Sequence, residues 1–583
     1  MRKLLFSLMA VTLFAGSFAW AGADDDKAAR SGEKTSSPSP GAKPSESAKP
    51  GTPAAESSAV ESELQQLREL IQEQTERLRG LQERLADVEG KVTASKSVSN
   101  RAASSATAAV QPATPADSVA ASAQPPAARQ EDNKDQEKKP SPLYFEIGRA
   151  KFTPGGFVDF TSLTRSTNVG GGLSTSFGTI PFSNTPAGRL SENRLSAQYS
   201  RLSLKVDAPV TNATSVTAYV ETDFFGFQPP NANITSNSYG LRLREFWADV
   251  KHGKWEVLGG QDWTLLQANR RGDSPYTPDV FYTYNEDQNF QVGLVWARQA
   301  QFRVTYHPTQ NLAVAVSAEN PQQFAPASVV FPSTTYLTQF DNGSSFTNTP
   351  SASTNLAVPN LHPDFIVKVA YDTELAHRPF HIEVAGLIRS FRVLNTLVTP
   401  NRTSTITGGG GSINFNLQLV KNLTLIANSF YSDGGGRYLG GLGPDAIVKP
   451  NGNLSAVHAS GGLGGLEWQA SRRYLFATYY GIAYFNRNFG FLPTPGSTCN
   501  GRTGFSCVGF GFPGSANITN RDVQEATFDA IPTLWSSENY GKLQVITQYS
   551  YLVRSPWSTL TTPPTPKNAH LSMVYAGIRY ILP

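Results

Sequence analysis

The sequence predicts an all-β fold, a 16-stranded antiparallel transmembrane β-barrel, over residues 143–583. Three observations predict it. Short segments alternate apolar and polar residues, the connections between them alternate in length, and no apolar run after the N-terminus reaches the roughly 18 residues of a spanning helix. Because each barrel strand contributes only alternate apolar residues, a barrel also fits the mean hydropathy of −0.30.

The alternation is clearest from Arg201 to Asp207. Leu202, Leu204 and Val206 share one face of the expected strand, and the polar residues share the other. In a soluble sandwich the apolar face points inward, whereas in a membrane barrel it points to lipid and the polar face lines a wet lumen. Alternation alone does not separate these two folds, but the connections do.

Seven short turns alternate strictly with eight long loops, and these fifteen connections join sixteen strands. An up-and-down barrel produces this asymmetry, because only one of its rims meets the exterior. The short turns are expected at 207–213, 251–254, 307–311, 373–379, 420–422, 470–473 and 536–541, and the long loops at 166–193, 226–238, 265–289, 320–363, 393–405, 432–456, 486–521 and 554–567.

Two strand assignments follow from this count. Gln291 to His307 is predicted to be one long tilted strand, because a hairpin within it would make the number of strands odd. The final segment, His570 to Leu582, is expected to close the barrel against Phe157 to Thr164. Aromatic residues near predicted strand ends suit the membrane interface, namely Trp255, Trp263, Trp296, Trp468, Trp535, Tyr474, Tyr479, Tyr480, Tyr549 and Tyr551.

The N-terminal part has a different character. Met1 to Ala21 has a basic start, an apolar core and a small-x-small end, which indicates a secretory signal peptide. Residues 22–59 and 95–142 are rich in Ser, Pro, Ala and charged residues and free of aromatics, so both are predicted to be disordered linkers.

Residues 60–94, between the two linkers, carry a heptad pattern that predicts a periplasmic coiled coil and therefore an oligomer. The polar Gln74 interrupts the seam, and the pattern does not decide between two and three helices. The a positions are Leu64, Ile71, Leu78, Leu85 and Val92, and the d positions are Val60, Leu67, Gln74, Leu81 and Val88.

Charge and cysteine usage exclude several function classes. From Tyr144 onward there are 23 Arg and 9 Lys against 27 Asp and Glu, without a recognition element for nucleic acid. No HExxH, GxSxG, Walker or metal-spaced His or Cys pattern is present, so we expect no enzyme, metal or cofactor. Cys499 and Cys507, the only cysteines, are candidates for a disulfide in an outer loop.

The candidate site is the segment from Tyr239 to Asn289. A predicted hairpin is followed by a long insertion in which Gly and Pro prevent continuation of the ladder. If this insertion folds into the lumen, Arg270 and Arg271 would face Arg242 and Arg244 and concentrate anions. Four acids, Glu245, Asp249, Asp262 and Asp273, are expected to hold these arginines.

Between Phe145 and Gln322 the chain contains five stretches in this order: YVETDFFG (219–226), GLRLREFWADV (240–250), LGGQDWTLL (258–266), ARQAQFRVTY (297–306) and SAENPQ (317–322). In these motifs this part of the chain resembles the DcaP-like trimeric outer-membrane porins. The resemblance implies a homotrimer with sixteen strands per chain that passes small anions, dicarboxylates being the associated solutes. This chain departs from many such barrels, which end on an aromatic residue, because it ends Tyr580-Ile581-Leu582-Pro583.

The sequence therefore predicts a porin in the outer membrane of a Gram-negative-type bacterium, in contact with membrane lipid and small anionic solutes. One alternative is a structural anchor whose coiled coil contacts the cell wall. A barrel enzyme is a second, and a phosphate-selective porin is a third, although residues 265–289 contain no Lys. An anion-selective current would separate a pore from an anchor or an enzyme.

Overall fold

The computed structural model describes residues 143–169, 172–226, 240–274, 282–285, 289–341, 359–515, 519–559 and 564–583. The predicted signal peptide, both linkers and the coiled coil lie outside the described residues. Among the described residues, no helix has the length and apolar character needed to cross a membrane.

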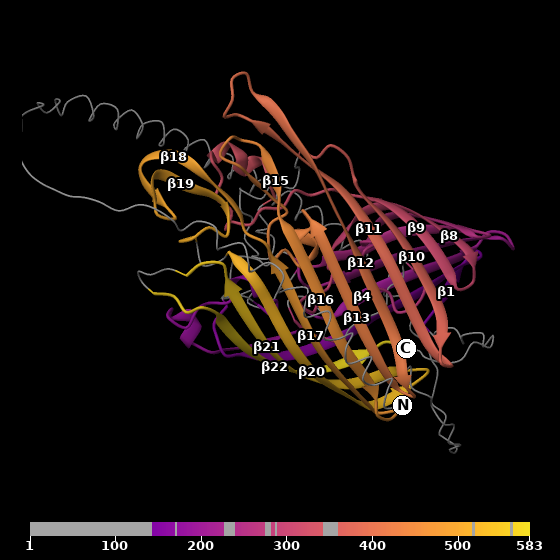
Figure 1. Cartoon of the computed structure of the whole chain (residues 1–583). Coiled ribbons are helices and arrows are strands. Elements are labelled where there is room, and N and C mark those ends of the chain that lie inside the picture. The colour runs from indigo at the N-terminus through magenta and orange to yellow at the C-terminus, as the bar shows by residue number, and fades with distance from the viewer. Residues whose placement is uncertain are drawn as a thin grey trace, which may run out of the picture. The chain divides into compact units, whose positions relative to one another are not determined.

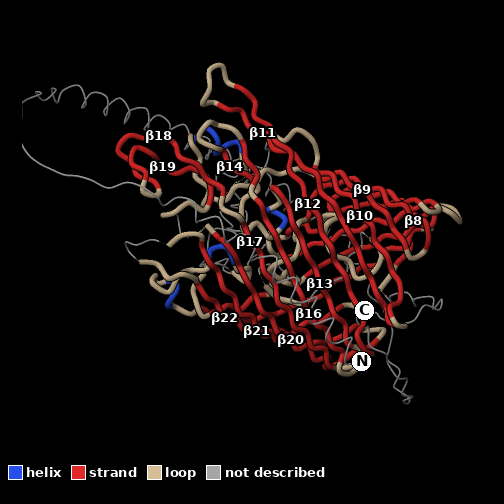
Figure 2. Tube along the Cα trace, viewed as in Figure 1, coloured by secondary structure: helices blue, strands red, loops and turns tan. Residues whose placement is uncertain are grey.

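The described chain forms a closed antiparallel barrel, in which each strand pairs with the next along the sequence (Figures 1 and 2). Its sheet is 18-stranded because it also includes the short β1 (Phe145–Ile147) and β3 (Glu192–Ser196), which pair with β2. The sixteen wall strands are β2 (Ala150–Arg165), β4 (Arg201–Pro209), β5 (Thr214–Asp223), β6 (Arg242–His252), β7 (Trp255–Trp263), β8 (Arg298–Thr309), β9 (Leu312–Glu319), β10 (Asp364–Leu375), β11 (Arg378–Asn395), β12 (Arg402–Val420), β13 (Leu423–Asp433), β16 (His458–Gln469), β17 (Tyr474–Phe485), β20 (Asn520–Ser537), β21 (Gly541–Pro556) and β22 (Ala569–Ile581).

The barrel closes between its first and last wall strands. β22 pairs with β2 from Phe157↔Ile581 to Arg165↔Met573. The predicted fold class and the predicted closing strand are therefore confirmed, although the chain ends without a terminal aromatic residue.

Two predicted boundaries are wrong. The strand expected over 291–307 begins at Arg298, because residues 291–297 pack inside the barrel and do not join the ladder. The long loop expected over 393–405 is short, because β11 and β12 continue their pairing as far as Asn395↔Arg402. Continued pairing satisfies backbone groups that an open loop would leave to water.

The wall has the polarity of a membrane barrel, and β10 shows it plainly. Phe365, Val367 and Val369 are exposed on the outer face, whereas Asp364 and Lys368 are buried on the inner face. Apolar side chains therefore face outward and charged ones inward, which is the arrangement expected when lipid surrounds the barrel.

This polarity predicts the effect of a charge on the outer face. Val369→Arg, near the middle of β10, is expected to lower the free energy of unfolding by about 2–4 kcal/mol, because the guanidinium would enter hydrocarbon. Leu375→Arg, at the end of the same strand, is the matched control, with an expected loss of about 0–1 kcal/mol. Urea unfolding from liposomes measures both, and equal losses would contradict a membrane position for this face.

The aromatic residues divide between the two faces. Trp255, Trp468 and Tyr474 are exposed on the outer surface near strand ends, as expected for an interfacial belt. Trp263 and Tyr479 are buried inside, and their assignment to the membrane interface was wrong. Each has a polar hydrogen that finds a carboxylate there: Trp263 Nε1 donates to Glu245 (2.9 Å) and the Tyr479 hydroxyl donates to Glu467 (2.6 Å).

At the end of the barrel where the long loops lie, apolar side chains of these loops form a buried cluster. The buried cluster there combines residues of five long loops, those after β2, β7, β9, β13 and β17, with inward residues of the wall. These loops contain short 3-10 helices and strands: η2 (Phe177–Thr179), η3 (Ala187–Arg189), η4 (Thr334–Gln339), η6 (Gly436–Tyr438), β14 (Ala446–Val448) and β15 (Leu454–Ala456).

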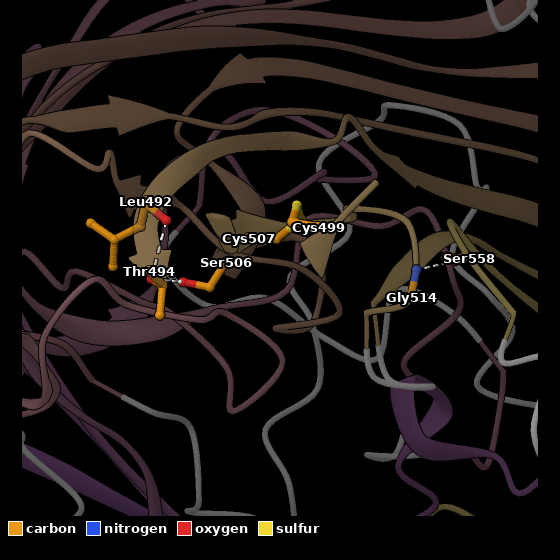
Figure 3. Close-up of a disulfide and its surroundings, with 7 residues drawn as sticks. All are labelled: Leu492, Thr494, Cys499, Ser506, Cys507, Gly514 and Ser558. Atoms are coloured by element: carbon orange, nitrogen blue, oxygen red, sulfur yellow. Dashed lines mark hydrogen bonds between the residues drawn. A yellow bond between two sulfur atoms is a disulfide. The ribbon is translucent and has the colours of Figure 1, made fainter. Parts of the chain in front are cut away.

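The loop between β17 and β20 contains a hairpin of its own, β18 (Asn488–Cys499) and β19 (Arg502–Phe510), which extends past the ends of the wall strands (Figure 1). Cys499 and Cys507 form a disulfide within it (Figure 3). The Thr494 and Ser506 hydroxyls also bond across the hairpin (2.7 Å). A tie between residues eight apart restricts the unfolded hairpin.

Candidate pore constriction

Between β7 and β8 the chain enters the barrel, and we call residues 264–274, 282–285 and 289–297 the lumen segment. Its first part lies against the inner face of β9 to β12: the Leu265 amide donates to Glu319 (2.8 Å) and Asn416 donates to the Asn269 carbonyl (3.1 Å). Its later part lies against the strands near the barrel closure, where the Val292 amide donates to Glu525 on β20 (3.0 Å). The lumen segment therefore contacts widely separated parts of the wall.

The middle of the lumen segment also reaches the closing strands. Gln548 of β21 accepts a hydrogen bond from the Tyr284 amide and donates to the Tyr284 carbonyl (3.0 Å). The Tyr284 hydroxyl donates to Asp159 of β2 (2.6 Å), which also binds Arg579 (2.9 Å). These contacts fix a tyrosine of the segment to the strands at the barrel closure.

The return of the lumen segment to β8 depends on close backbone approach. Gly293 has φ +93°, and a Cβ there would overlap the Gly462 carbonyl of β16. A Cβ on Gly481 of β17 would overlap the Val292 carbonyl in the same way. Glycine is required at both positions because the two backbones occupy the space of a side chain.

The two arginines predicted to line the constriction lie on the lumen segment in different environments. Arg270 binds Glu467 of β16 (2.5 Å), a carboxylate that also accepts from Tyr479. The side chain of Arg271 is exposed. Asp273, two residues further on, lies 3.6 Å from Lys368 of β10 and accepts from Asn269 (3.3 Å).

The arginines of β6 bind the neighbouring strand. Arg242 binds Asp223 (2.6 Å), and Arg244 binds both Glu221 (2.6 Å) and Asp223 (2.9 Å) on β5. These carboxylates were not among the expected partners. The described contacts thus place Arg242 and Arg244 against β5, whereas Arg270 lies against β16.

Of the four acids expected to hold these arginines, Glu245, Asp262 and Asp273 have other described hydrogen-bond or ion-pair partners. Glu245 accepts from the indoles of Trp247 (3.3 Å) and Trp263 (2.9 Å). Asp262 binds Arg303 of β8 (3.0 Å). Asp249 is buried on the inner face of β6, like Glu245. The acids of this region lie inside the barrel as expected, but their partners depend on strand neighbours that sequence distance does not show.

Solved structures that this barrel is similar to include outer-membrane channels and porins. The outer membrane channel DcaP of Acinetobacter baumannii matches with a TM-score of 0.50 and 15% identity, over 75% of this chain and 99% of that chain. The chain has the fold of DcaP. This likeness supports the resemblance to DcaP-like porins that the sequence motifs carry.

Two further porins match less well. An anion-selective porin from Comamonas acidovorans has a TM-score of 0.39 and 9% identity, over 74% of this chain and 100% of that chain. OprB of Pseudomonas putida has a TM-score of 0.39 and 12% identity, over 74% of this chain and 94% of that chain. No family model and no curated protein matches the chain. At such identities the likeness concerns the fold alone.

The barrel contains inward charges that sequence reasoning did not select. Arg303, Lys368, Glu383 and Glu467 are all buried, and each contacts the lumen segment or a charge beside it. Strand parity could have found them: in β8, Gln299, Gln301, Arg303 and Thr305 alternate with less polar residues. Within the described part of the barrel, no His, Cys, Asp or Glu cluster has metal-binding geometry.

Proposed function

We propose that the chain is an outer-membrane diffusion channel for small anionic solutes such as dicarboxylates, with selectivity set by the lumen segment. The observation that carries the proposal is a closed barrel, apolar outside and charged inside, crossed by a segment that bears two adjacent arginines. A barrel of sixteen strands leaves room for an aqueous path. Charge at its narrowest part then decides which ions pass.

Arg270 and Arg271 act differently in this proposal. The Arg270 guanidinium, bound to Glu467, positions the segment on the wall. Arg271, with its exposed side chain, presents positive charge to solutes. The chain is a non-enzymatic pore under this proposal, and its predicted coiled coil lies in the periplasm and supports a homotrimer.

Replacing Arg270 and Arg271 together by Ser is expected to reduce anion selectivity. Removing two positive charges lowers the local potential that concentrates anions. The measurement is the reversal potential of the full-length protein in planar bilayers under a salt gradient. We expect the wild-type potential to indicate anion preference and the double variant to move it toward zero.

The chain offers a matched control pair for this experiment. Arg472 and Arg473 are also adjacent, and both are exposed in the short turn between β16 and β17. Changing them to Ser removes the same charge outside the lumen and should leave the reversal potential near the wild-type value. An equal shift in both double variants would refute the assignment to the lumen segment, and absence of any current would refute the channel.

A further inference from the structure

Residues 269–273 of the lumen segment, which we call its tip, are bound to the wall by two carboxylates on adjacent strands. The Gly272 amide donates to Asp372 Oδ2 of β10 (2.9 Å), and the Asn269 amide donates to Glu383 Oε1 of β11 (3.1 Å). Gly272 has φ +57°, a left-handed conformation that suits glycine. These two amides are direct attachments of the segment's backbone to the wall.

A histidine lies between the same two carboxylates. His381 Nδ1 is 2.9 Å from Asp372 Oδ1, and His381 Nε2 is 3.4 Å from Glu383 Oε2. An ionised carboxylate only accepts hydrogen bonds, so a ring that binds both must donate from both nitrogens. Only the imidazolium has two donors, and the geometry therefore corresponds to a protonated His381.

Both charged and neutral groups surround His381. Lys368 lies 3.0 Å from Glu383 and 3.6 Å from Asp273, and its ammonium donates to the Gln267 carbonyl (2.7 Å). On β12 the groups facing this region are the neutral Asn414 and Asn416, which bind Glu383 and the segment's carbonyls. The charged groups in direct contact with His381 are Asp372 on β10 and Glu383 on β11. Lys368 on β10 joins Glu383 to Asp273 of the lumen segment and completes the cluster.

Protonation of His381 changes the balance among the groups in direct contact. With an imidazolium, two cations, His381 and Lys368, face three carboxylates. With a neutral ring, Lys368 alone faces them, and one ring nitrogen turns a lone pair toward a carboxylate. Lys368 and His381 are almost fully buried, so solvent screens the loss of the imidazolium's attraction to the carboxylates only poorly.

We propose that His381 is a positioning residue of the pore whose protonation holds the tip of the lumen segment on the wall. The inference rests on the proposed channel function and adds a pH response to it. When the ring loses its proton, Asp372 and Glu383 repel each other and Asp273, and the tip leaves the wall. The solute path is therefore wider at high pH, where the ring of His381 is neutral.

The first test is single-channel conductance of the full-length protein from pH 5.5 to pH 8.5. We expect wild-type conductance to rise with pH and the His381→Gln variant to keep the high-pH level throughout. His307→Gln is the matched control, because His307 also binds an inward carboxylate, Glu256 (3.0 Å), but outside this cluster. It should keep the wild-type profile, and an unchanged pH profile in His381→Gln would overturn the proposal.

A second measurement does not depend on current. Hydrogen exchange of peptides covering 264–274 is compared between wild type and His381→Gln at the same pH. We expect faster exchange in the variant at pH 5.5 and equal exchange at pH 8.5. Equal exchange at both pH values would contradict the role of His381. The expected difference in exchange without any current would support that role and refute the channel.

A second variant keeps the proposal testable if His381→Gln does not fold. Asp372→Asn keeps an oxygen that accepts from the Gly272 amide but removes the charge that favours the imidazolium. It should flatten the pH response of conductance and of exchange. A full wild-type response in Asp372→Asn would contradict the role of His381.

Discussion

Arg389→Met is expected to lower the free energy of unfolding by about 3–5 kcal/mol, because it removes a buried cation that two buried carboxylates share. Arg389 is 0% exposed and binds Asp445 (3.1 Å) and Asp364 (3.4 Å). It also donates to the carbonyls of Gly434 and Gln322. One guanidinium thus joins β11 to two long loops, and methionine replaces only its volume.

The loss should depend on pH through Asp445, which lies in the loop after β13. Burial raises the pKa of Asp445 above its ordinary value, and Arg389 opposes that rise. Without Arg389 the pKa of the folded state rises further, so the folded variant binds a proton that the unfolded chain releases. The contribution of this proton to the stability of the variant is then present at low pH, and it is lost as pH rises through the pKa of Asp445 in the folded state.

Urea unfolding at two pH values measures both parts of this prediction. Arg402→Met is the control, because Arg402 is exposed at the first residue of β12 and should change stability by no more than about 0.5 kcal/mol. Losses of similar size in the two variants would show that Arg389 does not hold the loops.

Gly481→Leu is expected to release the returning half of the lumen segment and to increase conductance. The new side chain would occupy the position of the Val292 carbonyl, and such overpacking costs about 1–3 kcal/mol. The segment can move and the wall cannot, because Gly481 is paired on both sides, with Leu463 and Glu525. The hydrogen bond from the Val292 amide to Glu525 would be lost with it.

Single-channel recording of wild type, Gly481→Leu and Gly464→Leu checks this result. Gly464 is opposite Tyr480 on the outer face, and a Cβ there has nothing within 4 Å. Its leucine variant should conduct like wild type. Unchanged conductance in Gly481→Leu, with the barrel still folded, would mean that this part of the segment does not limit passage.

Much of the barrel could be predicted because its causes are local. A polar residue every second position and a short turn at one rim are properties of neighbouring residues, so strand number and the β2–β22 closure followed from them. The start of β8 did not, because Gln291 to Ala297 are apolar enough to continue a strand. Only the contact of Gly293 with the wall explains why they lie inside.

The candidate site was less predictable. The sequence drew attention to Arg270, Arg271 and Asp273, and their position between glycine and proline residues suggested a departure from the wall. Their described partners are Glu467, almost 200 residues later, and Lys368, almost 100 residues later. Without knowing the strand order around the barrel, no spacing rule connects such residues.

By itself the sequence determined the class of fold, the number of strands, which face of each strand carries charge, and the presence of an arginine-containing insertion. These depend on periodicity and on turn chemistry, which act over a few residues. The tertiary structure alone decided that the insertion reaches Asp372 and Glu383, the two carboxylates beside His381 in the β10–β11 hairpin. The contacts of the insertion depend on closing the sheet, since closure is what places inward side chains of distant strands around one lumen.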